Sequence, residues 1–155
     1  MTTAATLPDQ VLLETLSKLE RALLTPPIAG EMSNWAREAR QGAATLATDW
    51  TREQNCVLHP QYEQIAQTDP EMHTCVQQMT EQEQAISVRL VEFHEHLHQL
   101  EEATSHVDWQ ESKLSSLQKQ VEALGLQLII QIKKQQAAAS TWLSEAVYRD
   151  RGVKD

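Results

Sequence analysis

The chain has 155 residues, a formal net charge of −9 and 41% hydrophobic residues. A chain of this length fits one domain, and its many Gln, Glu, Ala and Leu residues favour helices over strands. The acidic balance argues against a nucleic-acid backbone or an anionic membrane surface as partner. Neither a secretory signal nor a run of roughly 18 apolar residues is present, so we expect a cytoplasmic protein. In that compartment Cys56 and Cys75 are expected to be reduced thiols, although two cysteines could in principle pair.

Proline residues divide the first half of the chain into helical segments. The first predicted helix covers residues 10–24, where leucines recur at 4-3-4 spacing and therefore fall on one face. A Pro-Pro pair ends it. The second predicted helix covers residues 31–57, which carry tryptophans and small alanines on one face. A linker is expected from Leu58 to Asp69, with room for one helical turn at Tyr62 to Ala66.

Two further helices are predicted in the second half. Asp69 followed by Pro70 has the pattern of an N-cap and a first helical position, so the third helix is predicted over residues 70–103. The last helix is predicted over residues 108–149, and it either runs unbroken or is kinked at Gly125. Asp108 can cap this helix.

Each predicted helix has a single apolar stripe, and the four stripes can be buried only against one another. We therefore predict an all-α fold, an antiparallel up-down four-helix bundle that forms one domain over residues 1–155.

Polar residues interrupt three of these stripes once each, at Glu53, Glu83 and Gln135. A buried carboxylate is unfavourable unless it is paired, hydrogen-bonded or protonated. One interpretation is a polar pocket inside the bundle. The alternative is that the register of the long helices drifts by one position and leaves these side chains at the rim. If the interior is an unused relic, Glu83→Leu is expected to be neutral or stabilising.

Two short runs and the helix order resemble a known family. The C-terminal run from Glu145 to Gly152, with the closing Asp155, is similar to the tail of a bacterial subgroup of hemerythrin-like proteins, also called the HHE cation-binding family. The start of the predicted second helix is also similar to that subgroup, at Pro27, Gly30, Glu31 and Trp35. The resemblance implies a four-helix bundle that holds two irons with several histidines and bridging carboxylates and that binds or senses oxygen.

The positions at which the resemblance implies iron ligands carry other residues here. The third helix of the family has a Glu-His pair, and this chain has Glu83 and Gln84. The fourth helix has a His where this chain has Gln135. The second helix usually supplies a His and a carboxylate, whereas this chain offers only Asp49 and Glu53 there. Because a glutamine oxygen is a weak iron ligand compared with imidazole, we predict that the scaffold is kept and the di-iron centre is lost.

The remaining histidines give at most a weak metal site. His94 and His98 are four residues apart on the third predicted helix and could bridge one metal ion. The core positions of that helix place His94 on a flank and His98 toward solvent, which favours surface imidazoles. The sequence has no zincin motif, no nucleophile elbow and no phosphate-binding glycine loop, so we predict no catalytic residues and no enzyme.

The leading hypothesis is a non-catalytic interaction or regulatory module without a cofactor. Its degenerate pocket would contain Glu53, Glu83, Gln84 and Gln135, and it would act as a monomer or homodimer with a protein partner. The alternative is a di-iron or other metal-binding, oxygen-sensing protein that uses Glu53 and Glu83 with a nearby His. An exported or membrane-associated adaptor would need a signal or a basic amphipathic face, and neither is present in the sequence.

Overall fold

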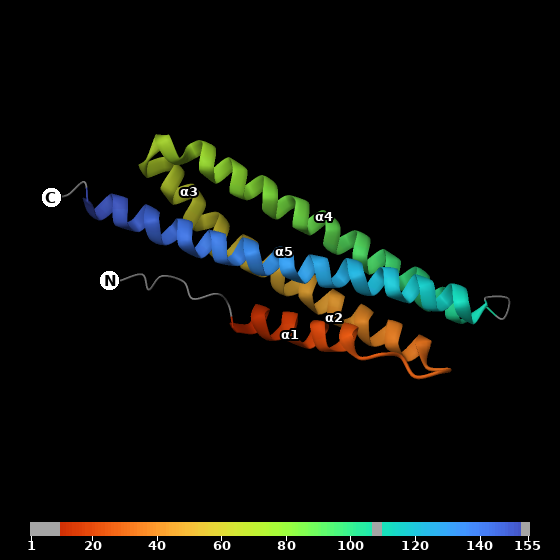
Figure 1. Ribbon diagram of the computed structural model, residues 1–155. Coiled ribbons are helices and arrows are strands. Elements are labelled where there is room, and N and C mark those ends of the chain that lie inside the picture. The colour runs from red at the N-terminus through yellow and green to blue at the C-terminus, as the bar shows by residue number, and fades with distance from the viewer. Residues whose placement is uncertain (1–9, 107–109, 153–155) are drawn as a thin grey trace.

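In the computed structural model the described residues are 10–106 and 110–152, and all of their regular structure is helical (Figure 1). The chain order is α1 (Gln10–Leu24), α2 (Met32–Glu53), the π-helical segment η1 (Gln54–Leu58), α3 (His59–Thr68), the 3-10 turn η2 (Pro70–Met72), α4 (His73–Thr104) and α5 (Glu111–Gly152). Because α2, η1 and α3 follow one another without a break, the described residues form four helical rods. The prediction of an all-α bundle is confirmed.

The first helix forms over the predicted residues because its leucine stripe is fully covered. Leu12, Leu16, Leu19 and Leu23 are each at most 1% exposed. Gly30 provides the turn to α2 with a φ of 85°, which a residue with a side chain rarely adopts. The indole of Trp35 then donates to the Thr25 carbonyl at 2.9 Å and ties this loop to α2.

The predicted linker from Leu58 to Asp69 is wrong, because most of it is the helix α3. Pro60 lies in the first turn of α3, immediately after the π-helical turn. In that turn the His59 N–H bonds to the Gln54 carbonyl, five residues back. A proline ring clashes with the carbonyl four residues before it, so the wider turn lets the helix pass Pro60.

Asp69 ends α3 and begins the next element, as its N-cap pattern predicts. Its backbone is extended, and its carboxylate accepts a hydrogen bond from the Glu71 N–H at 3.1 Å. The cap starts η2, so α4 begins at His73 and not at residue 70.

The last helix is unbroken through Gly125. A Cβ at this position would lie 2.6 Å from Leu23 Cδ1 and 2.7 Å from Phe93 Cζ, so glycine is needed for close packing. Leu124, which the apolar spacing assigns to the stripe, is turned away from the core and is 43% exposed. The predicted cap Asp108 lies outside the described residues, and α5 begins at Glu111.

The buried apolar residues form two separate clusters. The larger one, here called the main core, contains the α1 leucines together with Trp50, Ile86, Phe93 and Ile132. The smaller one, here called the end cluster, consists of Leu58, Tyr62 and Ala139, with the partly buried Val76, Met79, Trp142 and Leu143 packed against them.

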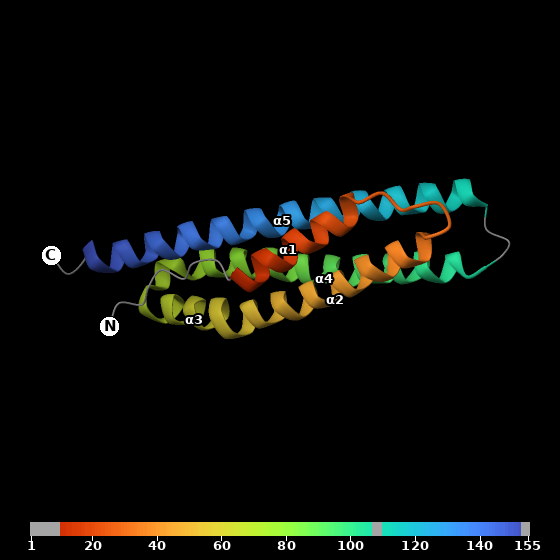
Figure 2. The same cartoon turned by 90° about the horizontal axis from the view of Figure 1, so that it is seen from below.

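The end cluster lies in the part of the bundle that α1 does not cover. Both views show α1 alongside the middle of α5, whereas α3 lies beyond the N-terminal end of α1 (Figures 1 and 2). Among the described helices, α3, α4 and α5 are therefore the ones that surround the end cluster. Within residues 10–106 and 110–152, no helix combines the length and the apolar character that a bilayer crossing needs.

Candidate functional site: a buried polar layer

Five polar side chains occupy the level between the main core and the end cluster. This group, here called the polar layer, consists of Glu53, Gln54, Glu83, Gln135 and Gln136, each at most 7% exposed. Along each helix the layer falls between a main-core residue and an end-cluster residue: Trp50 and Leu58, Ile86 and Met79, Ile132 and Ala139. The interruptions seen in the sequence therefore meet at one level of the bundle.

Glu83 is the centre of the hydrogen bonding in this layer. The Tyr62 hydroxyl of α3 donates to Glu83 Oε1 at 2.6 Å. The Gln135 amide of α5 donates to the same oxygen at 3.5 Å and lies 3.9 Å from Met79 Sδ. The other carboxyl oxygen, Oε2, lies 4.0 Å from Nε2 of His59. One carboxyl group thus connects three of the four rods.

Burial dominates the electrostatics of this group. Burial raises the pKa of Glu83 above its ordinary value, and the hydrogen bonds from Tyr62 and Gln135 oppose that shift. The pKa of Tyr62 is also raised, mainly by burial, then by its hydrogen bond to Glu83 and by the charges of Glu83 and Glu53. Tyr62 therefore remains a neutral donor, and Glu83 is held toward its protonated form.

Several polar atoms near this end of the bundle have no hydrogen-bond partner in the described structure. They are both amide atoms of Gln54, Nε2 of Gln136, Nε1 of Trp142 and Oε2 of Glu83. An unsatisfied buried polar atom costs about 1–3 kcal/mol. An apolar layer would pack here without that penalty, so the polar layer lowers the stability of this end relative to a fully apolar bundle.

The residues of the layer do not fit a di-iron centre. Two carboxylates, Glu53 and Glu83, are buried there, with His59 as the nearby imidazole. Oε1 of Glu83 already accepts the Tyr62 hydroxyl. Among the described residues, no group of three or more His, Cys, Asp or Glu side chains could hold a metal ion. Glutamine amides supply only weak, neutral ligands in the remaining positions.

The structure separates the predicted site residues into two groups. Glu53, Glu83 and Gln135 are buried in the layer, so the register does not drift to the rim. Gln84 is exposed, and its assignment to the pocket is corrected. Gln84 is rotated by about 100° around the helix from the buried Glu83, and this rotation brings it to the solvent side of α4.

The histidine pair lies far from this layer on the surface of α4. His94 is partly buried, and His98 is exposed and lies 3.3 Å from the Glu102 carboxylate. Among the described residues the pair is not part of a group of three or more His, Cys, Asp or Glu side chains that could hold a metal ion.

Tyr62, Gln54 and Gln136 belong to the site but were not predicted from the sequence. The four-residue spacing from Leu58 to Tyr62 is a helical signal for Tyr62, although it lies in a segment interpreted as a linker. Gln54 and Gln136 each follow a predicted polar interruption directly, and nothing in the spacing marks glutamine as buried.

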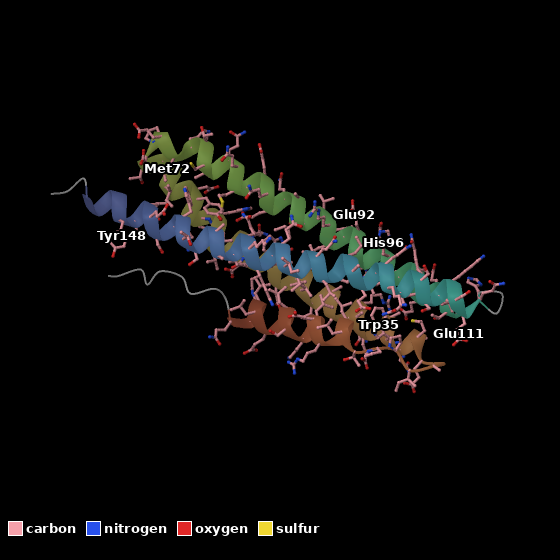
Figure 3. The ribbon with its side chains drawn as sticks, viewed as in Figure 1. Trp35, Met72, Glu92, His96, Glu111 and Tyr148 are labelled. Carbon is pink, nitrogen blue, oxygen red and sulfur yellow. The ribbon has the colours of Figure 1, made fainter. Side chains whose placement is uncertain are left out.

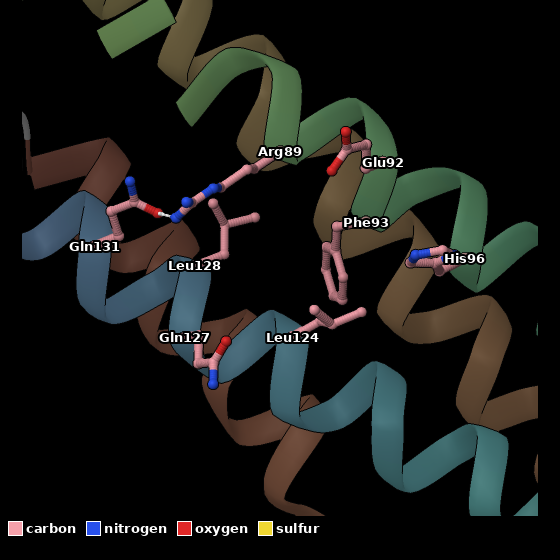
Figure 4. Close-up of a pocket in the computed structure, with 8 residues that line it drawn as sticks. All are labelled: Arg89, Glu92, Phe93, His96, Leu124, Gln127, Leu128 and Gln131. Carbon is pink, nitrogen blue, oxygen red and sulfur yellow. Dashed lines mark hydrogen bonds between the residues drawn. The ribbon is translucent and has the colours of Figure 1, made fainter. Parts of the chain in front are cut away.

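A second feature is a groove of about 290 Å³ between α4 and α5 (Figure 4). Its lining combines apolar and polar side chains: Arg89, Glu92, Phe93, His96, Leu124, Gln127, Leu128 and Gln131. Arg89 donates to Gln131 across the groove. Figure 3 shows Glu92 and His96 on α4 above this region, away from the bundle interior. The groove is a surface feature and is separate from the polar layer.

No family model matches the chain, and no curated protein or solved structure matches it.

Proposed function

We propose that this chain is a non-catalytic, hemerythrin-like helical bundle that has lost di-iron binding and that works in the cytoplasm as an interaction or regulatory module. The observation that carries the proposal is the hydrogen bonding of Glu83. Where a hemerythrin-like centre would place iron between carboxylates and imidazoles, Tyr62 and Gln135 donate to this carboxyl group.

The proposed antiparallel up-down order is supported by the path of the chain. The short connection after Leu24 brings α2 back along α1, and the C-terminal end of α4 and the N-terminal end of α5 lie at the same end of the bundle (Figures 1 and 2). Short connections between consecutive helices are typical of up-down bundles. This order is also the one that the hemerythrin-like resemblance implies.

An interaction role is supported by apolar side chains on the surface of α4 and α5. Val88 and Val91 of α4 are 58% and 62% exposed, and Leu124 of α5, which lines the groove, is 43% exposed. Exposed apolar side chains grouped along two neighbouring helices are a common feature of protein interaction sites. Glu92, in the same region, adds negative charge to this face.

Elemental analysis of untagged protein produced with added iron tests the loss of the di-iron centre. We expect less than about 0.1 iron per chain and no absorbance from an iron centre in the visible region. An established hemerythrin-like protein purified in parallel serves as the positive control. One to two irons per chain with visible absorbance would reject the proposal and favour a metal-binding, oxygen-sensing function.

The interaction role is tested by cross-linking in cells followed by purification under denaturing conditions. The double variant Val88→Asp, Val91→Asp should lose a specifically cross-linked protein that the wild type retains. The matched control is Val147→Asp, because Val147 is also exposed but lies far along α5. Equal recovery from both variants would contradict an interaction through the α4 face.

A further inference from the structure

Helix α3 buries few side chains against the rest of the bundle. Tyr62 is its single buried residue among ten. The helix joins the end cluster, which is separate from the main core, and α1 does not reach this level (Figure 2). Regions with few buried apolar contacts open locally at a lower free energy than the whole domain. Tyr62 is therefore the main buried contact between α3 and the rest of the bundle.

The segment that joins α3 to α2 is the π-helical turn η1. Such turns are places where long helices bend, and they often lie at functional sites. Gln54, the first residue of η1, has two buried amide atoms without hydrogen-bond partners in the described structure. Rearrangement of η1 would expose these atoms to water, so movement of α3 about η1 removes a penalty that the closed state carries.

We propose that α3 is a pH-controlled latch: Tyr62 holds α3 against α4 while Glu83 is protonated, and ionisation of Glu83 releases α3 through a bend at η1. This device is independent of the interaction role proposed above and of the absence of iron. It would let the cell's pH control the exposure of the end cluster.

The groups that face Glu83 favour release when it ionises. From α3, Tyr62 donates to it and the half-exposed His59 lies 4.0 Å from its free oxygen. Glu53, at the end of α2, is buried in the same layer, and its negative charge acts on Tyr62. From α5 the facing group is the neutral amide of Gln135. A deprotonated Glu83 would thus be a buried charge in a layer that holds a second carboxyl group, and its Oε2 has no hydrogen-bond partner in the described structure.

The hydrogen bond from Tyr62 would strengthen on a carboxylate and so opposes release. Burial is nevertheless the larger effect on Glu83, because its pKa is raised despite both hydrogen bonds. In the open state water reaches Glu83 and its pKa returns toward the ordinary value. The closed state is therefore fully favoured below that ordinary pKa, and it is lost as pH rises through the higher pKa of the closed state.

Hydrogen exchange of the α3 amides, measured by mass spectrometry from about pH 5 to about pH 8, tests the latch. Peptides from the main-core part of α4 serve as an internal reference and correct for the ordinary pH dependence of exchange. In the wild type, the opening equilibrium of α3 should rise relative to this reference by about tenfold for each unit by which burial raises the pKa of Glu83. The reference itself should stay constant.

Two variants distinguish the latch from general loosening. In Glu83→Gln the side chain cannot ionise, so the rise of α3 exchange with pH should disappear while α3 stays protected. Glu95→Gln, on the exposed side of α4, should keep the wild-type pH dependence. A wild-type α3 whose corrected exchange does not change with pH would overturn the proposal. The same holds if Glu83→Gln shows the wild-type rise.

Discussion

Replacing Glu83 by leucine tests whether the hydrogen bonds of this buried carboxyl group stabilise the protein. The substitution removes a buried carboxyl group and keeps a similar volume, which on its own is neutral or stabilising. The structure adds a cost, because the buried Tyr62 hydroxyl loses the acceptor at 2.6 Å. A buried hydroxyl without a partner costs about 1–3 kcal/mol, and the 3.5 Å bond from Gln135 adds little. We expect Glu83→Leu to lower the free energy of unfolding by about 2 kcal/mol.

Urea titration followed by circular dichroism measures this change at neutral pH. The double variant Tyr62→Phe, Glu83→Leu also removes the hydroxyl that has lost its acceptor. Its free energy of unfolding should therefore be about 1–2 kcal/mol higher than that of Glu83→Leu alone. Glu95→Leu on the exposed side of α4 is the control and should change stability by no more than about 0.5 kcal/mol. A Glu83→Leu protein as stable as the wild type would refute the reasoning, and the interior would then be an unused relic.

Two further substitutions test other parts of the packing. Gly125→Ala should destabilise the protein by about 1–3 kcal/mol, because the new Cβ would lie 2.6 Å from one side chain and 2.7 Å from another. Gly42→Ala is the matched control, because the tightest contact of its Cβ would be the flexible end of Leu19, Cδ1, at 3.1 Å. The gain in helix propensity of about 1 kcal/mol offsets this contact, so the melting temperature should not fall. Thr15→Val should lower the free energy of unfolding by about 1–3 kcal/mol, because the hydroxyl that donates to buried Asp49 at 2.6 Å is lost. A urea titration measures this change. An unchanged midpoint would mean that water satisfies this carboxylate.

The apolar spacing predicted the helices well where one face is buried along the whole element. The bounds of α1 agree with the prediction, and the polar interruptions at Glu53, Glu83 and Gln135 all lie inside the bundle. Both results follow from the 3.6-residue repeat, which determines which side chains face the partner helices. The helical spacing therefore predicts which polar residues, as well as which apolar ones, face the interior of the bundle.

The segment after α2 could not be predicted in the same way. Pro60 normally marks a break, and the π-helical turn that accommodates it depends on backbone hydrogen bonds that leave no trace in apolar spacing. Tyr62 was missed for the same reason. The prediction for Gln84 is wrong for another reason: it rested on the residue pair that the hemerythrin-like resemblance implies, and only the first residue of the pair, Glu83, faces inward.

The polar layer also affects how the rods can be aligned along their length. A helix displaced by one turn moves about 5.4 Å along its axis, so Glu83 would then meet aliphatic side chains and Tyr62 would have no acceptor. Apolar layers tolerate such sliding better, because one leucine resembles the next. The polar layer therefore lowers the stability of the bundle but specifies one alignment of its helices. One buried polar residue selects the register of a coiled coil in the same way.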